Sequence, residues 1–155
     1  MSSARLGVLV AVLAGSALLV VGALAAPTAR PSLSISIIGP SKGVVAGSRI
    51  QYVLVMKNIG NVSIGQVRLS LIPAVDVAAS SVPYKRTFRP IYKTYSVYWS
   101  PQHFRPGAKY TVHLVLRFPV LPGGGEGTVF SADAHGTAPY VFKYAEKPVY
   151  FKQPG

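Results

Sequence analysis

Apolar and polar side chains alternate along much of the chain after residue 31. In the clearest stretch every second residue is apolar, namely Tyr110, Val112, Leu114, Leu116 and Phe118. A shorter stretch repeats the pattern at Val67, Leu69 and Leu71. Strict alternation buries one face of a strand and leaves the other in water, which is typical of antiparallel sheets. The pattern therefore predicts an all-β domain.

Further strands are expected where short apolar runs are bounded by turn-forming residues. They cover residues 33–38, 49–57, 92–99, 128–134, 140–143 and 149–152. The stretch 72–90 is long for a loop, so we also expect an edge strand near residues 75–78. Turn formers such as Pro106-Gly107 and the glycine run 123–125 separate the strands. Seven or eight short strands predict an immunoglobulin-like antiparallel β-sandwich over residues 31–155.

The N-terminal segment, residues 1–30, has a different character. Residues 6–26 are uncharged and lie between Arg5 and Arg30. As a helix this segment would rise about 30 Å, the thickness of a bilayer core. We therefore expect one N-terminal hydrophobic helix, either a retained membrane anchor or a signal peptide cleaved between Ala25 and Ala26. Pilin-style cleavage before the apolar run is a third interpretation, and all three export the rest of the chain.

Composition argues against several kinds of chemistry. The chain has no cysteine, which excludes disulfides, zinc-thiolate sites and thiol nucleophiles. Its four carboxylates are scattered over the sequence, at Asp76, Glu126, Asp133 and Glu146. A hydrolytic acid–base pair needs two carboxyls close across one bond. We expect no enzymatic activity, no catalytic residues and no cofactor.

One metal-site hypothesis can be built from histidines and a carboxylate. Asp133 and His135 lie two residues apart and share one face of a strand, and His113 would complete a three-ligand set. The spacing alone is a weak signal, and solvent-facing polar residues on alternating strands are the favoured interpretation. We expect no metal.

Positive charge is the most informative part of the composition. There are 16 Lys and Arg against 4 Asp and Glu, a formal charge of +12. Residues 77–125 hold seven bases and no carboxylate, with aromatic residues between them. The candidate polyanion-binding or partner-binding residues are Lys85, Arg86, Arg89, Lys93, Tyr92 and Trp99. Acidic glycans or anionic headgroups suit such a surface, and for an exported domain nucleic acid is the least favoured ligand. The alternative is a solvated strand face.

The segment 58–61 carries two interpretations. Asn58, Gly60 and Asn61 tolerate left-handed backbone, so we expect a hairpin turn in which Gly60 has a positive φ. Asn61-Val62-Ser63 is also an acceptor sequence for N-glycosylation, and an exposed turn of an exported domain is the right context for it.

Several of these motifs occur in one order. Gly47 precedes a strand that ends in Lys57-Asn58-Ile59-Gly60-Asn61, and Trp99 is followed by a Pro106-Gly107 turn before Tyr110-Thr111-Val112. This order resembles the CARDB-type, cell-adhesion-related immunoglobulin-like modules of archaeal and bacterial surface proteins, over residues 34–136. The resemblance implies surface display, adhesion or assembly, and provides no catalytic residues to carry over. The chain differs in its leader, its basic tyrosine-rich stretch 84–98 and its extension after Thr137.

The sequence thus favours an exported, non-enzymatic structural or adhesive subunit of the cell surface. Residues 32–38 and 140–152 are strand-like, so they either pair within their own sandwich or are donated to a neighbour to form a filament. One alternative is a single-span accessory subunit of a membrane complex, held by residues 6–26. The other is a polyanion-binding module. The expected partners are further copies of the chain or other surface and membrane proteins.

Overall fold

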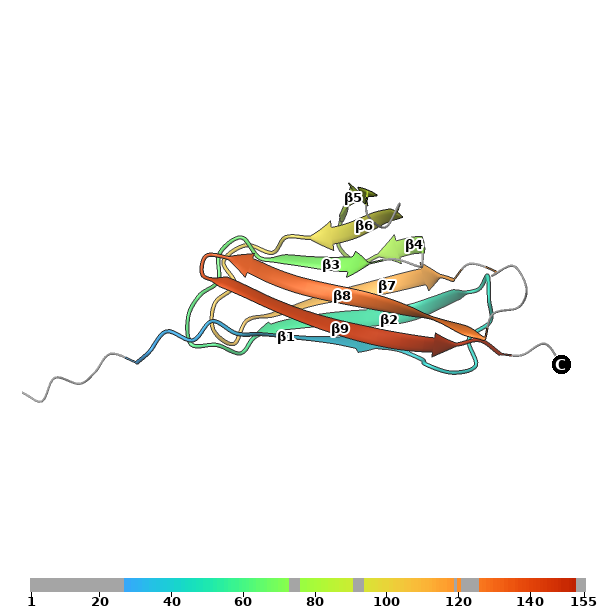
Figure 1. The fold of residues 1–155 in the computed structure, drawn as a ribbon, viewed down its shortest axis with the longest axis horizontal. Helices are drawn as coiled ribbons and strands as arrows, with labels where there is room; N and C mark the ends of the chain where they lie inside the picture. Colours follow the sequence, from blue (N-terminus) through green and yellow to red (C-terminus); the bar gives the residue numbers. More distant parts are fainter. Residues whose placement is uncertain (1–26, 73–75, 91–93, 119, 121–125, 153–155) are drawn as a thin grey trace, which may run out of the picture.

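The computed structural model describes residues 27–72, 76–90, 94–118, 120 and 126–152, which form a two-layered β-sandwich (Figure 1). The first sheet has the order β1 (Leu33–Ile38), β2 (Arg49–Asn58), β7 (Lys109–Arg117) and β4 (Asp76–Ser80). The second has the order β5 (Lys85–Arg89), β6 (Thr94–Trp99), β3 (Arg68–Ile72), β8 (Gly127–Thr137) and β9 (Tyr140–Tyr150). All neighbouring strands run antiparallel, as predicted.

The number of strands differs from the prediction of seven or eight, because nine strands lie in the described ranges. Strand β5 was missed because none of its side chains is buried, so it has no apolar alternation. The two short strands predicted at 140–143 and 149–152 are one continuous strand, β9. Pro148 does not break it: β9 lies at the edge of its sheet, the position where proline is tolerated in a strand. The edge strand predicted near 75–78 is confirmed as β4.

The core lies between the two sheets and is built by the alternating apolar residues. Leu114 and Leu116 of β7 are at most 2% exposed, and Leu69 and Leu71 of β3 are fully buried opposite them in the second sheet. Burying one such side chain contributes about 2 kcal/mol. The period of two in the sequence was therefore sufficient to identify the inner faces of β3 and β7.

Tyr52 of β2 forms the centre of an aromatic cluster in this core. Its ring meets those of Phe118 and Phe130 edge-on, with centroids 5.9 and 5.1 Å away. Its hydroxyl donates a hydrogen bond to the carbonyl of Pro40 at 2.6 Å. Burial raises the pKa of Tyr52 to about 12, because the phenolate would have to form away from water.

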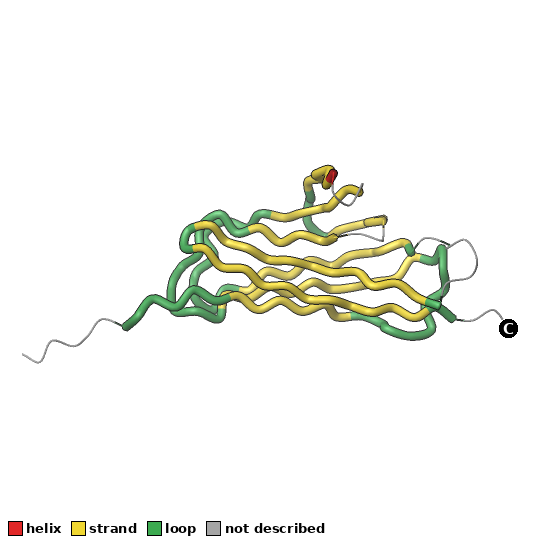
Figure 2. The backbone as a smooth tube through the Cα atoms, in the orientation of Figure 1, coloured by secondary structure: helices red, strands yellow, loops and turns green. Residues whose placement is uncertain are grey.

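The loops gather at the two ends of the sandwich (Figure 2). Residues 27–32 leave from the end where β1 begins, which we call the loop end; it also comprises the loops 59–67, 100–108 and 137–140. No helix among the residues described here is long and apolar enough to cross a membrane. The predicted N-terminal helix, the Ala25–Ala26 cleavage site and the glycine run 123–125 lie outside the described residues.

Both strand-like extensions pair within their own sandwich. β1 pairs with β2 from Leu33↔Asn58 to Ile38↔Val53, and β9 pairs with β8 along its whole length. After β1 the chain bonds to the end of β9, with Lys152 N donating to Val44 O at 2.8 Å. β1 and β9 therefore close one side of the sandwich. On the other side, β5 and β6 extend past the first sheet (Figure 1).

Candidate functional site

The outer face of the second sheet carries a polar cluster centred on a buried carboxylate. Asp133 points away from the core, because its neighbours on β8, Ala132 and Ala134, point inward, yet it is only 5% exposed. Its Oδ1 lies 3.6 Å from an Nη of Arg89, and its Oδ2 lies 3.6 Å from Nδ1 of His135. Arg89 Nε also donates to Ser96 Oγ at 3.1 Å. We call Arg68, Arg89, Ser96, Asp133 and His135 the Asp133 cluster.

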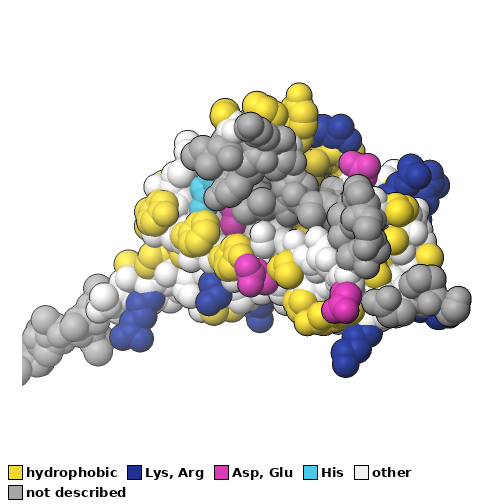
Figure 3. All heavy atoms as spheres, turned by 45° about the vertical axis from the view of Figure 1, so that its right-hand side comes forward, with side chains coloured by type: hydrophobic (Ala, Val, Ile, Leu, Met, Phe, Trp, Pro, Cys, Tyr) yellow, Lys and Arg dark blue, Asp and Glu magenta, His cyan; other side chains and the backbone are white. Residues whose placement is uncertain are grey.

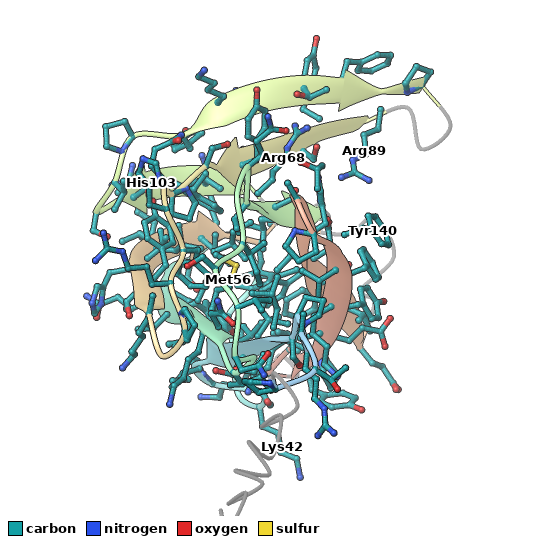
Figure 4. The ribbon with its side chains drawn as sticks, turned by 90° about the vertical axis from the view of Figure 1, so that its left-hand side faces the viewer. Lys42, Met56, Arg68, Arg89, His103 and Tyr140 are labelled. Carbon is teal, nitrogen blue, oxygen red and sulfur yellow. The ribbon has the colours of Figure 1, made fainter. Side chains whose placement is uncertain are left out.

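Arg68 stands opposite His135 in the ladder of β3 and β8 and contacts the β5–β6 hairpin. Its guanidinium carbon lies 3.5 Å from the centre of the Tyr98 ring, a cation–π contact, and an Nη donates to Thr87 Oγ1 at 3.2 Å. Figure 4 labels Arg68 and Arg89 on the side of the molecule where this hairpin lies. Arg68 Nε and Ser70 Oγ are buried without a hydrogen bond to the described part of the chain. The cluster therefore ties β5 back onto the sheet with polar contacts alone.

The structure separates the predicted basic and aromatic residues. Lys85 and Arg86 are exposed on β5, whereas Arg89 is turned onto Asp133. Trp99, predicted on this surface, instead belongs to the core: it is 2% exposed and donates its indole N–H to Val82 O at 3.2 Å. Tyr92 and Lys93 lie outside the described residues. Among the described members of the predicted set, Lys85 and Arg86 are thus the exposed ones.

The Arg86 guanidinium is held by a neighbouring ring and does not extend alone into solvent. It lies over Tyr84, 5.7 Å from the ring centre, and donates to the Tyr84 hydroxyl at 3.3 Å. That hydrogen bond raises the pKa of Arg86 further above its ordinary value. Tyr84 in turn meets the buried Trp99 edge-on.

A row of exposed aromatic side chains follows the outer face of β9. Tyr140, Phe142, Tyr144 and Tyr150 are 74%, 53%, 45% and 52% exposed and, being separated by even numbers of residues, share one face. We call these four residues the aromatic row. The Tyr144 hydroxyl donates to Glu146. Figure 3 shows hydrophobic side chains in a row beside a histidine, with acidic side chains close by, and Figure 4 labels Tyr140 at its start.

Sequence reasoning missed the aromatic row. Residues 140–152 were read only as a strand-like extension, although the alternation Tyr140, Phe142, Tyr144 was visible in the sequence. Aromatic residues at every second position of a solvent-facing strand indicate a contact surface, because they form a contiguous exposed apolar patch and such patches mark interaction sites.

The predicted hairpin turn at 58–61 is wrong, because β2 does not pair with β3. The chain leaves β2 and crosses to the second sheet. Asn58 is fully buried, and its amide donates to the carbonyls of Val62 and Phe104, both at 2.8 Å. Gly60 does not have a positive φ; a side chain there would collide with the carbonyl oxygen of Arg30. Glycine is needed because another backbone approaches, as the turn prediction did not foresee. Gly107 does have the positive φ expected of its turn.

Asn61, the predicted glycosylation acceptor, is exposed and bonded to the connecting segment. Its Oδ1 accepts from the backbone N–H of Arg30 at 2.7 Å, and its Nδ2 donates to Thr28 O at 3.0 Å. An N-linked glycan would be attached to the same nitrogen.

The suggested metal ligands do not converge. His113 lies on β7 in the first sheet, whereas Asp133 and His135 lie on β8 in the second. The described residues contain no group of three side chains able to hold a metal ion. His113 instead borders a groove of about 420 Å³ beside β4, with Gln51, Ser81 and Val115 also in its lining. The Ser81 hydroxyl accepts from the His113 backbone N–H and not from its ring, so no nucleophile–base pair forms there.

No protein-family model and no curated protein matches this sequence. Solved structures do match. AvmM, which catalyses macrocyclization in alchivemycin A biosynthesis, superposes with a TM-score of 0.54 at 12% identity, over 79% of this chain and 90% of that one. The CARDB domain of a Pyrococcus furiosus protein, in complex with di-metal ions, superposes with a TM-score of 0.50 at 14% identity, over 79% and 89%. A chain of a type I cohesin–dockerin complex from Clostridium thermocellum gives a TM-score of 0.47 at 13% identity, over 82% and 99%.

These similarities confirm the fold resemblance to a CARDB domain that the sequence motifs indicated. A fold shared by an enzyme and a CARDB domain does not decide between catalysis and binding, so function has to be argued from the surfaces of this chain.

Proposed function

We propose that this protein is an exported, non-enzymatic adhesive module of the cell surface, and that it binds another surface or membrane protein through the aromatic row of β9. The observation that carries the proposal is the row itself, four large rings on one face, each at least 45% exposed. Tyrosine and phenylalanine are enriched in protein interfaces, where they bury much area and lose little side-chain entropy.

The surroundings of the row fit an interface. Val129 of β8, 53% exposed, stands opposite Pro148 of β9 and widens the apolar surface. The exposed Glu146, which shares this face and accepts from the Tyr144 hydroxyl, provides charge beside it. An apolar centre with a polar rim is the usual composition of a protein-binding patch. Exposed aromatic rings can also bind a sugar chain through their faces. The test below therefore has to distinguish a protein partner from a glycan.

Contact through a face is favoured over strand donation. Both extensions that might have been donated, β1 and β9, already pair within the same sandwich. The edge strand β4 contains a bulge between Val77 and Ala79, and the edge strand β5 carries three bases, Lys85, Arg86 and Arg89. Bulges and charged side chains at a sheet edge hinder pairing with a further strand.

The polyanion alternative rests on the exposed bases Lys85 and Arg86. It predicts retention on a heparin-type resin that falls with salt and is lost in a Lys85→Glu, Arg86→Glu variant. Retention that the variant keeps would reject this surface as the polyanion site.

The proposal is tested by placing a photo-crosslinking amino acid at Phe142 of the full chain in intact cell envelopes. A matched control carries it at Phe88, which is 50% exposed compared with 53% for Phe142 but lies on β5. We expect a discrete protein adduct from position 142 and not from 88. The adduct should fall at least tenfold when Tyr140→Ala and Tyr144→Ala are added. Adducts with carbohydrate only, or the same adducts from both positions, would overturn the proposal.

A further inference from the structure

The loop end of the sandwich is a single hydrogen-bonded unit. Ile64 N donates to Phe104 O at 3.0 Å, and Gly65 N donates to Ala138 O at 2.8 Å. The buried Asn58 amide joins the loops 59–67 and 100–108 from inside. Three loops from distant parts of the sequence thus form one surface, and its shape does not depend on any one of them alone.

The segment that leads to residues 6–26 is fixed to this surface. Ile59 N and Gly60 N both donate to Ser32 O, at 3.0 and 3.2 Å, and Asn61 bonds to Arg30 and Thr28. We call the two side-chain bonds of Asn61 the Asn61 clasp. Because Thr28 is already held, only Pro27 separates the clasped chain from the uncharged stretch that ends at residue 26. The module therefore has no free linker at this point of the described chain.

The exposed charges at the loop end are all basic. Lys57 and Lys109 stand directly opposite each other on β2 and β7, a like-charge pair that destabilises a sheet unless an anion lies near. Arg30 and Arg105 are exposed in the adjoining loops. Neither ion pair found within the described ranges involves these four residues.

Carboxylates are placed elsewhere in the described structure. Asp76 begins β4 and Glu126 precedes β8, both at the opposite end of the sandwich, and Asp133 and Glu146 lie within strands. At the loop end Ile59, 56% exposed, adds an apolar side chain among the bases. Bases around an exposed apolar side chain suit the anionic headgroup layer of a bilayer.

We propose that the loop end rests on anionic lipid headgroups, with residues 6–26 in the bilayer, and that the Asn61 clasp fixes the orientation of the module above the membrane. This rests on the proposed function as an exported surface module, but it does not involve Phe142 or the partner that the aromatic row binds. The clasp holds the connection between residues 6–26 and the sandwich in one orientation. The long axis of the sandwich then points away from the membrane, and the outer face of β9 lies on the flank of the module, where a partner can reach it.

The chain offers a clean test because it has no cysteine. Ile59→Cys and Val45→Cys form a matched pair, since the two side chains are 56% and 55% exposed and lie at opposite ends. The full chain is labelled at one position with a polarity-sensitive fluorophore and reconstituted into phosphatidylglycerol–phosphatidylcholine vesicles with headgroup-level quencher lipids. We expect at least threefold stronger quenching at position 59. Equal quenching at 59 and 45 would overturn the proposal.

Two further arms identify the cause. In vesicles of phosphatidylcholine alone the excess quenching at 59 should fall by half or more, and an unchanged excess would overturn the assignment to anionic lipid. Asn61→Ala should bring the signal at 59 toward that at 45. Ser63→Ala also removes the glycosylation sequence but keeps the Asn61 amide, so it should leave the signal unchanged. Equal effects of the two variants would overturn the clasp.

The outcomes remain separate from those of the proposed function. Crosslinking at Phe142 that persists while the quenching difference is absent would overturn the membrane-facing assignment alone. If the chain recovered from cell envelopes began at Ala26, the proposed membrane attachment would be overturned. The proposed adhesion through the aromatic row would stand.

Discussion

Strands β7 and β5 show two ways of holding a strand in the same sandwich. β7 lies between two neighbours, and its inward residues Val112, Leu114 and Leu116 are at most 2% exposed. β5 has one neighbour, β6, against which Phe88 packs on Tyr95, and no buried side chain. Its contacts with the strands beyond β6 are polar: Arg89 to Asp133, and Thr87 to Arg68. The buried apolar core stabilises the whole sandwich cooperatively, whereas these few polar contacts stabilise only the strand that they hold. The sandwich body should therefore unfold as one, and β5 should open separately from it.

The largest expected effect comes from the body. Leu114→Ala should lower the free energy of unfolding by about 3 kcal/mol, because it removes buried methyl groups and leaves a cavity. Denaturant titration of the full chain should show one transition moved to lower concentration. Ile59→Ala, at an exposed position, is the control and should shift stability by less than about 0.5 kcal/mol. Similar losses in both variants would contradict the assignment of the core.

The next effect concerns the hairpin. Asp133→Ala removes the carboxylate that faces Arg89 and His135 and should cost about 1–3 kcal/mol, since it leaves the partly buried Arg89 guanidinium without its charged partner. Hydrogen exchange should speed up in β5 far more than in β2 and β7. The exposed Glu126→Gln is the matched control for losing a carboxylate. Uniform acceleration across both sheets would show that the two regions are not separable.

Tyr52 tests the body through pH. A tyrosine whose pKa is raised from 10 to about 12 in the fold keeps its proton there longer than in the unfolded chain. Its contribution is therefore complete below pH 10 and is lost as pH rises toward 12. Tyr52→Phe should cost about 1 kcal/mol at neutral pH, from the lost bond to Pro40, and flatten this alkaline decline. Unfolding curves measured from pH 8 to 12 provide the check, and an equally steep decline in the variant would contradict it.

The smallest effect sharpens the picture of β5. Thr87→Val keeps the shape of the side chain but removes the acceptor for Arg68, at a cost of about 0.5–1 kcal/mol confined to the hairpin. Exchange of the β5 amides should rise by less than tenfold, with no change in the denaturation midpoint. A shift of the midpoint as large as that of Leu114→Ala would mean that Arg68 supports the body as well.

The same contrast explains what could be predicted from sequence. The inward faces of β3 and β7 follow from alternation, because burial on one side is a property of neighbouring residues along one strand. Asp133 and His135 were also placed on one face by the same rule. The partnership of Asp133 with Arg89 could not be found, because it depends on the strand order β5-β6-β3-β8, which is set by tertiary contacts. Trp99 was assigned to the surface from its basic neighbours in sequence, whereas its partners in space are apolar.

Gly60 shows the same limit at the level of the backbone. The residue type indicated that space or freedom was needed, and a positive φ was the natural interpretation. The reason in the structure is the approach of residues 30–32, more than 25 positions away in sequence. The spacing of the aromatic row could be read from the sequence. The exposure of its side chains could not, because it depends on where β9 lies among the other strands.

The pairing of β1 with β2 determines how the module would respond to a mechanical load. Residues 27–32 leave the sandwich at the end where β1 begins (Figure 1). A force applied to residues 27–32 along the long axis of the sandwich would therefore act along β1 and load the ladder from Leu33↔Asn58 to Ile38↔Val53 in shear. In shear the hydrogen bonds of a ladder resist together, whereas a perpendicular pull opens them one after another. In the arrangement proposed above, the module would therefore carry tension between the membrane and its partner without first losing its terminal strand β1.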